Sequence, residues 1–370
     1  MAEPERAWPP QRPASAAVGK ALDVTAMVRR LRWQAVGCRE MGSPLYGSLL
    51  EHVADDVLDG GPCADVLAGH EEDPGPSALA LRLMGAVHRL VLERRAPELA
   101  KFYPSVGGTL DVDGSWPTFR RVVSEHGDEL RRTLDRPPQT NEVGRAASLI
   151  GGLLHVADRW SGPVRLFEIG ASAGLNLRAD GFRVELTDGT GVGPVDSSVV
   201  LRDPWLGRRP PDVPLHVVER RGCDTEPVDP TTEEGRLRLT SYVWPDQLER
   251  LERLRGALQI AAQVPARVLR QSARDFVGDL QLAPGTTTVV WHSIMWQYLD
   301  DQERSDVEAR LQQLGDTADA DARLAHLALE PRRRTTSSDH EILVVLRIWP
   351  DGEERILGSA SAHGIPVNWD

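Results

Sequence analysis

Apolar positions in the first part of the chain recur at helical spacing. After Ser43 and Pro44, apolar side chains return every three or four residues, and residues 78–95 show the same pattern. A serine followed by a proline is typical of a helix start, where the missing proline N–H costs nothing. We therefore expect an all-helical domain over residues 17–160, behind a Pro- and Ala-rich tail at residues 1–16 that we expect to be disordered.

After residue 160 the pattern changes to short apolar runs with the length of buried strands. Helical stretches separate several of these runs, and this alternation predicts parallel strands joined by right-handed crossovers. The expected strands cover residues 164–169, 215–219, 266–269, 287–291 and 324–329. The expected helices between them cover residues 247–263, 274–280 and 302–314.

The end of the chain predicts an antiparallel hairpin. Residues 341–349 and 354–361 are β-rich and flank a Pro-Asp-Gly turn. A Gly-, Asp- and Pro-rich section at about 179–214 reads as an insertion, with a small hairpin near 182–186. The second domain, over residues 161–370, is thus expected to be an α/β domain.

The most informative motif follows the first expected strand. Glu168, Gly170, Ser172 and Gly174 stand where a strand, a glycine-rich turn and a helix start follow one another. Glycines allow a ligand to approach the backbone closely, and a helix N-terminus offers free N–H groups. Ligands of open α/β sheets bind at this edge, so the motif predicts a small-molecule site.

This motif resembles the first motif of class I S-adenosylmethionine-dependent methyltransferases, with Ser172 in place of a family glycine. The resemblance implies a Rossmann-like sheet of parallel strands ending in an antiparallel hairpin, with S-adenosylmethionine as cofactor. It also implies that Glu168, Gly170, Ser172 and Gly174 lie against the amino-acid part of that cofactor.

Two later segments extend the resemblance. Asp224 follows the second long strand, where the family has an acid that binds the ribose hydroxyls, and Glu185 is a rival because it is nearer in sequence. Ala273 falls where the family contacts adenine, although Ser272 replaces the usual aspartate and can instead cap a helix.

The turn after the fourth expected strand supplies candidate chemistry. His292 is the candidate catalytic base because histidine titrates near neutral pH. Trp296 and Gln297 are candidate substrate contacts at the same sheet edge, and a Trp face can hold a sulfonium. A buried aromatic packing cluster with one hydrogen-bonded histidine is the alternative interpretation.

A polar segment before the last helix of the helical domain is a second source of substrate contacts. Asn141, Glu142 and Arg145, with Gln139 beside them, lead towards the strand that carries Glu168. Residues of this type at a helix start usually cap the helix. In many small-molecule methyltransferases a helical N-terminal segment covers the cofactor, so the resemblance implies a lid here.

Two other functions remain open at this point. The run from Gly170 to Gly174 is also a G-x-S-x-G sequence, so Ser172 is a candidate hydrolase nucleophile, with Asp339 and His363 in the required order. Glu168 would then sit unfavourably near the developing oxyanion. The departures at Ser172 and Ser272 also allow a binding module without catalysis.

Several segments together resemble a bacterial family named only as domain of unknown function 2332, over nearly the whole chain. That resemblance supports the domain layout and implies no reaction. The segments begin at Gly170, Arg221, Tyr242 and Trp291.

The composition limits the classes of ligand and partner that the protein is expected to bind. The 370 residues carry 43 Lys and Arg against 55 Asp and Glu, a formal charge of −12, which argues against nucleic acid and favours a small-molecule substrate. The three cysteines are far apart, which fits a reducing cytoplasm, and no metal-ligand spacing is present. No apolar run is long enough to span a membrane.

Overall fold

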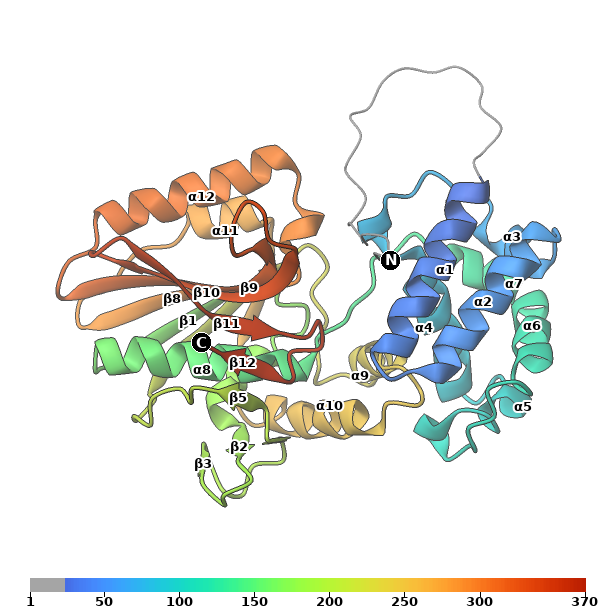
Figure 1. The fold of residues 1–370 in the computed structure, drawn as a ribbon, viewed down its shortest axis with the longest axis horizontal. Coiled ribbons are helices and arrows are strands. Elements are labelled where there is room, and N and C mark those ends of the chain that lie inside the picture. The colour runs from blue at the N-terminus through green and yellow to red at the C-terminus, as the bar shows by residue number, and fades with distance from the viewer. Residues whose placement is uncertain (1–23) are drawn as a thin grey trace.

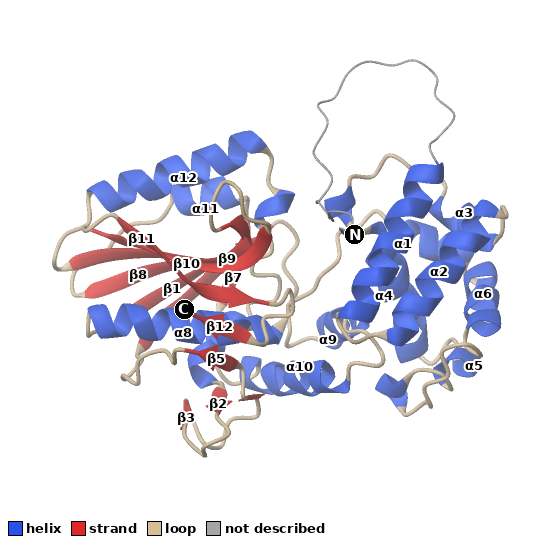
Figure 2. Cartoon of the chain, viewed as in Figure 1, coloured by secondary structure: helices blue, strands red, loops and turns tan. Residues whose placement is uncertain are grey.

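The computed structural model describes residues 24–370, so the tail expected at residues 1–16 lies outside the described residues. The described chain forms two lobes that lie side by side (Figure 1). One lobe is helical and the other is built on a large sheet, as Figure 2 shows by colour. The expected combination of a helical N-terminal part with a mostly parallel sheet is confirmed.

The helical lobe has its own hydrophobic core, which runs from Met27 to Leu134. Pro44 opens its second helix, and the Ser43 hydroxyl accepts a hydrogen bond from Tyr46 N, as expected for a cap. Its elements are α1 (Val24–Glu40), α2 (Pro44–Leu58), α3 (Pro62–Leu67), η1 (Gly75–Ser77), α4 (Leu79–Leu92), α5 (Pro97–Ala100), η2 (Pro104–Val106), α6 (Trp116–Glu125) and α7 (Gly127–Thr133).

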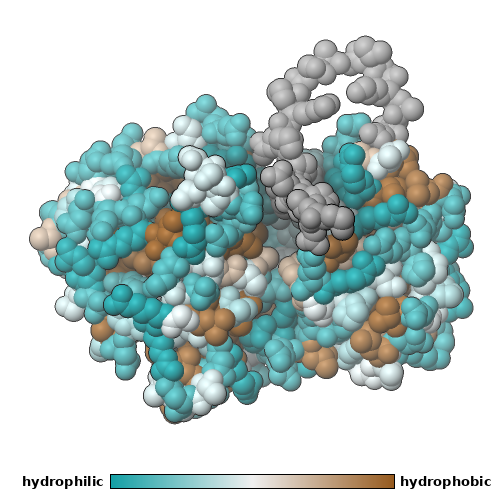
Figure 3. All heavy atoms as spheres, viewed as in Figure 1, coloured by the Kyte–Doolittle hydropathy of each residue, from teal (hydrophilic) through white to brown (hydrophobic). Residues whose placement is uncertain are grey.

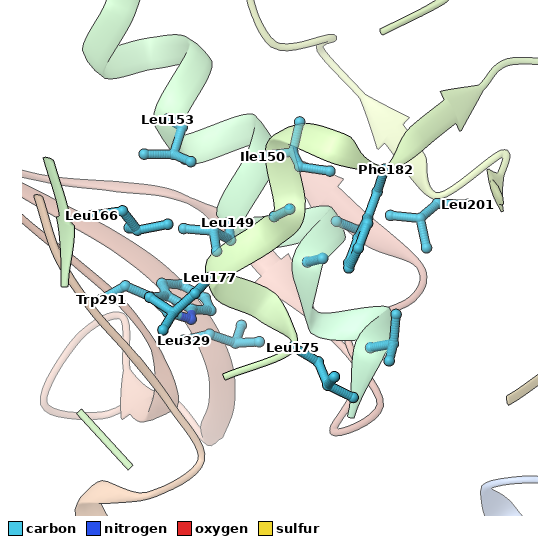
Figure 4. Packing of buried hydrophobic residues seen from close by; sticks show 14 of the residues in the cluster. Leu149, Ile150, Leu153, Leu166, Leu175, Leu177, Phe182, Leu201, Trp291 and Leu329 are labelled. Atoms are coloured by element: carbon cyan, nitrogen blue, oxygen red, sulfur yellow. The ribbon is translucent and has the colours of Figure 1, made fainter. Parts of the chain in front are cut away.

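The helix expected at the end of the helical half packs on the sheet instead of on the helical lobe. It follows η3 (Val143–Arg145) and is α8 (Ala146–Arg159). Figure 4 shows its leucines meeting Leu166 and Trp291 of the sheet. Gly152 permits this close packing, because a Cβ there would lie 2.3 Å from Leu327 Cδ2.

The main sheet follows the order β5-β12-β11-β10-β9-β8-β1-β6-β7. Its long parallel strands are β1 (Val164–Ile169), β6 (Val217–Asp224), β7 (Arg267–Arg270), β8 (Thr286–Ser293) and β9 (Ala322–Arg333). All five lie where the sequence predicts strands. In spatial order β1 stands between β6 and β8, as in doubly wound sheets.

The antiparallel end of the sheet is larger than expected. The predicted hairpin is present as β10 (His340–Trp349) and β11 (Glu353–Ala360). However, β9 continues to Arg333 and also pairs antiparallel with β10, so the three strands form a meander. The edge is extended by β12 (Val367–Trp369) and by β5 (Trp205–Gly207), which comes from the insertion.

The rest of the insertion forms a separate small sheet. It contains β2 (Arg183–Glu185), β3 (Gly191–Val192) and β4 (Val200–Arg202), and β2 pairs antiparallel with β3 as expected. The helix expected to follow the glycine turn is only the 3-10 segment η4 (Asn176–Gly181), because the chain leaves there for the small sheet.

Helices cover both faces of the main sheet. The side of β1 that carries Leu166 faces α8, whereas Phe167 and Ile169 face the core formed with α11 (Ala273–Gly278) and α12 (Asp301–Asp316). Strand residues alternate between faces, so the register also decides which polar residues share a face.

The two lobes are joined by a segment between β6 and β7. It contains α9 (Glu233–Ser241) and α10 (Leu248–Ala261), and Trp244 between them is buried in the core of the helical lobe. Asp246 accepts hydrogen bonds from Ser43 Oγ and Leu45 N. The sheet lobe is therefore anchored to the helical lobe through its own crossover.

The face seen in Figure 3 is mainly hydrophilic, with scattered apolar side chains. Over residues 24–370, no helix combines the length and apolarity that a bilayer crossing requires.

Removing the Trp244 side chain should uncouple the lobes. Trp244→Ala is expected to lower the free energy of unfolding by about 3–5 kcal/mol, because a buried Trp is replaced by a cavity. Urea denaturation followed by circular dichroism measures this loss. The matched control is Leu248→Ala, at a half-exposed position nearby, which should change stability by roughly 0.5 kcal/mol or less. Equal effects of the two substitutions would contradict the anchoring.

Candidate functional site

The candidate site lies at the carboxyl ends of β1, β6 and β8. The turn from Gly170 to Gly174 follows β1, Asp224 ends β6 and Ser293 ends β8. Strand order reverses at β1, since its sequence neighbour β6 lies on one side and β8 on the other. Open α/β sheets bind ligands in the crevice at this switch point.

Two loops at this edge carry unusual backbone. Gly170 and Gly174 have φ of 67° and 66°, and Ser172 between them has φ of 53°. Ile294, directly after β8, has φ of 49°, which is a true outlier for a β-branched residue. Strain of this kind concentrates at functional sites and must be held by surrounding contacts.

The glycines of the turn are packed against the protein's own side chains. A Cβ at Gly170 would lie 3.0 Å from Met295 Cβ, and one at Gly174 would lie 2.8 Å from Val268 Cγ2. Arg178 supports the turn by donating from Nη1 to Gly174 O, at 2.6 Å. These glycines are thus required for internal packing as well as for their positive φ.

The segment that leads from the helical lobe to α8 lies on the glycine turn. We call residues 139–145 the strap. Asn141 Oδ1 accepts hydrogen bonds from Ala173 N at 3.2 Å and Leu175 N at 3.0 Å. Ser172 Oγ donates to Gln139 Oε1 at 2.5 Å. The strap therefore takes backbone N–H groups that a ligand would meet at the start of a helix.

Glu142 attaches the strap to α10. Its carboxylate accepts hydrogen bonds from Gly144 N and Arg250 Nε, at 3.0 and 2.6 Å. Burial opposes ionisation of Glu142, but Arg250, His363 and the Gly144 amide outweigh it and hold the pKa at about 2. This ionised pair is a structural anchor, so Asn141 and Glu142 hold the site together.

Asp224 lies at the glycine turn, whereas Glu185, the other candidate for binding the ribose hydroxyls, does not. The carboxylate of Asp224 accepts from Ser172 N and Glu226 N, both at 2.9 Å. Each oxygen can accept a second hydrogen bond. Glu185 is exposed in β2 of the small sheet, 4.0 Å from Arg202. Of the two ribose candidates, the structure brings only Asp224 to the turn.

Glu168 is a buried acid with an unmade hydrogen bond. It is 3% exposed, and its Oε2 atom has no hydrogen-bond partner among residues 24–370. Burial raises the pKa of this carboxyl to about 8, the neighbouring indole N–H of Trp291 acts against the rise, and Asp224 adds to it. Glu168 is therefore mainly protonated at neutral pH. Trp291 Nε1 also has no hydrogen-bond partner among the described residues. A buried polar atom without a partner needs an explanation, and a bound water, ion or ligand can supply the missing hydrogen bond.

His292 points to the other face of the sheet. Glu168 is paired with Trp291 in the register of β1 and β8, so the next residue faces α12. His292 is fully buried, and its Nδ1 lies 2.8 Å from Glu330 Oε1 and its Nε2 lies 2.9 Å from His326 Nε2. Both ring nitrogens are therefore occupied within the protein.

Glu330 organises the loop after β8. Its Oε1 also accepts from Met295 N at 3.0 Å and Trp296 N at 3.3 Å, which identifies His292 Nδ1 as a donor. The Trp296 ring stacks on His292, with centroids 4.7 Å apart. Gln297 follows in η5 (Trp296–Tyr298) and is half-buried. These contacts hold the strained Ile294 loop against the glycine turn.

Arg145 is the strap residue that reaches the end of β8. Its Nη1 donates to Ser293 O at 3.2 Å and its Nε donates to Ala362 O at 3.1 Å. Burial lowers the pKa of this guanidinium, which nevertheless stays charged because Arg pKa values are so high. Among the predicted substrate residues, Arg145, Trp296 and Gln297 thus lie along the β8 end.

The two residues expected near adenine lie at the start of α11. Ser272 Oγ accepts from Asp275 N at 3.1 Å and caps α11, in line with the alternative interpretation. Ala273 is buried at the first position of that helix.

The hydrolase triad is not assembled in the described chain. Gln139 holds Ser172 Oγ, and neither Asp339 nor His363 hydrogen-bonds to it within residues 24–370. Asp339 is exposed in the turn between β9 and β10. Over the described residues, no group of three or more His, Cys, Asp and Glu is placed to hold a metal ion.

Sequence reasoning missed Glu330, His326 and Met295. A usable signal was present in β9, where His326 and Glu330 stand four residues apart and therefore share one face of an otherwise apolar strand. Met295 carries no such signal, because its place beneath Gly170 depends on tertiary contacts.

Stability should depend on pH through Glu168. Its pKa is raised on folding, so its contribution is complete below about pH 4.5 and is lost as pH rises towards 8. Glu168→Gln should abolish this decline, which amounts to roughly 1 kcal/mol per pH unit for one proton. Denaturant titrations from pH 5 to 9 measure it, with Glu185→Gln as control. Parallel curves for the wild type and Glu168→Gln would contradict the raised pKa.

Comparison with known proteins supplies the family. No curated protein matches the chain. The model of a family described as an uncharacterised protein conserved in bacteria, DUF2332, matches residues 28–369, which include both lobes and all of the site. The chain therefore belongs to this bacterial family.

Proposed function

We propose that this protein is an S-adenosylmethionine-dependent methyltransferase that acts on a small molecule. The observation that carries the proposal is Glu168. This acid lies at the carboxyl end of β1, next to the glycine turn and the switch point, and its Oε2 lacks a partner among the described residues. An ammonium group placed there would complete the hydrogen bonding and favour the ionised acid.

The residues present fit the amino-acid end of the cofactor better than its adenine end. Glu168 provides an acceptor for the ammonium group, and Asp224 keeps free acceptor capacity for ribose hydroxyls. Ser272 is used to cap α11 and offers nothing specific to adenine. When bound, S-adenosylmethionine supplies an electrophilic methyl group, and the protein has mainly to align it with an acceptor.

Access to Glu168 requires movement of one loop. Oε2 is buried, so a ligand reaches it only if the glycine turn or the loop after β8 shifts. Ser172 and Ile294 hold positive φ in these two loops and are the natural hinge positions. His292 then acts as a positioning residue through Trp296 and Glu330.

The acidic charge supports a small-molecule acceptor. A formal charge of −12 disfavours the phosphate backbone of nucleic acid. The segment η5, which follows β8, contacts η1 of the helical lobe. We place the acceptor at the β8 end, beside η5.

Calorimetry tests the cofactor. Full-length protein should bind S-adenosylmethionine, and the heat at pH 7 should depend on the buffer because Glu168 releases a proton on binding. Glu168→Gln should bind at least tenfold more weakly and lose the buffer dependence. Asp224→Asn should also weaken binding.

Glu185→Gln is the matched control for these variants and should bind as the wild type does. Absence of any heat with folded wild-type protein would refute the proposal. Equal weakening by Glu185→Gln would remove the assignment of Asp224.

A serine hydrolase that uses Ser172 is the second candidate function. The φ of 53° at Ser172 is the kind of strained backbone found at a nucleophile elbow. We expect no labelling by a fluorophosphonate probe, since Gln139 holds the hydroxyl and no histidine contacts it in the described chain. Mass spectrometry reads the result. Labelling that disappears in Ser172→Ala would favour the hydrolase over the methyltransferase.

A further inference from the structure

Arg145 is a cation without a carboxylate partner. Within residues 24–370 it forms no ion pair, and its hydrogen bonds go to the backbone oxygens of Ser293 and Ala362. Its Nη2 atom carries no hydrogen bond to the described chain. Arg145 is half-buried, and Nη2 is not among the buried atoms that lack a partner, so this end of the guanidinium is open to a ligand. The guanidinium stays charged, because Arg does not lose its proton in proteins.

The carboxylates around Arg145 already have other hydrogen-bond partners. Glu142 pairs with Arg250 at 2.5 Å, and Glu330 accepts from His292 and from two backbone amides. Glu168 is close enough to interact electrostatically with Arg145, but it is mainly protonated at neutral pH. One positive charge is therefore left over at the end of β8.

One aromatic side chain of η5 lies near Arg145. Tyr298 lies within its electrostatic range and is half-exposed, and Trp296 and Gln297 belong to the same short 3-10 segment. A guanidinium binds a carboxylate through parallel N–H groups, which gives orientation as well as attraction.

We propose that the methyl acceptor carries a carboxylate and that Arg145 binds it at the end of β8, beside η5. That the ligand is a methyl acceptor rests on the proposed function. That Arg145 binds a carboxylate does not depend on it. Arg145 is fixed by the β8 end and by the loop before β12, so the proposed carboxylate site lies beside Glu168, on the neighbouring strand, and uses a different side chain.

The test uses full-length protein and ligand-observed NMR titration. The probes are benzoate and indole-3-acetate, each compared with its neutral amide, with and without S-adenosylhomocysteine. The acids should bind and the amides should bind at least tenfold more weakly. Arg145→Gln should weaken acid binding at least tenfold, and Arg145→Lys should retain part of it.

Arg323→Gln is the matched control, because Arg323 lies over Trp160 near the start of β9, at the opposite end of the sheet. It should bind the acids as the wild type does. Thermal melts verify folding, and if Arg145→Gln is unfolded, Arg145→Lys and the acid-to-amide ratio of the wild type decide the question.

Two results would overturn the inference. One is equal binding of acids and amides to the wild type. The other is that Arg145→Lys weakens S-adenosylhomocysteine but not 5′-methylthioadenosine, which lacks the amino-acid part, because Arg145 would then serve the cofactor. If S-adenosylhomocysteine does not bind at all while acids still need Arg145, the proposed function fails and the carboxylate site stands.

Discussion

The hydrogen bonds from Ala173 N and Leu175 N to Asn141 Oδ1 are the constraint on which the site depends. A backbone N–H buried without a partner costs about 1–3 kcal/mol, so one amide oxygen stabilises both donors of the turn. Because Asn141 belongs to the strap, the geometry of the glycine turn is linked to the path of the chain between the lobes. Glu142 extends the link to α10 through Arg250.

This link changes which groups of the glycine turn are available to a ligand. In dinucleotide-binding folds the N–H groups after the first strand meet a pyrophosphate at a helix N-terminus. Here the following helix is only the short segment Asn176–Gly181, and a side chain already occupies those donors. What remains available at the switch point is the unmade hydrogen bond of Glu168 and the charge of Arg145. Those two groups suit two ligands side by side, one with an ammonium group at Glu168 and one with a carboxylate at Arg145.

The sequence predicted the strands well because each is a short apolar run bounded by turn residues. The run 164–169 coincides with β1, and the closing hairpin is present. The packing of α8 was not predictable from periodicity, since an apolar stripe does not reveal which partner it will meet. The 3-10 form of η4 likewise depends on the insertion that follows it.

The site was predictable in part. Glu168, Asp224 and the glycine turn follow from strand ends, which topology brings to one edge. Which face of the sheet carries His292 could not be predicted without the register of β8, because a shift of one residue moves every side chain to the opposite face. Its partners His326 and Glu330 lie on β9, and only strand pairing places them beside it.

Hydrogen–deuterium exchange with S-adenosylhomocysteine tests the central claim most directly, because it locates binding without assuming a reaction. The account predicts slower exchange in peptides covering residues 168–176, the end of β6 and residues 293–298, with the outer helices of the helical lobe unchanged. Protection confined to another region, or no protection at a saturating ligand concentration, would contradict a cofactor site built on Glu168.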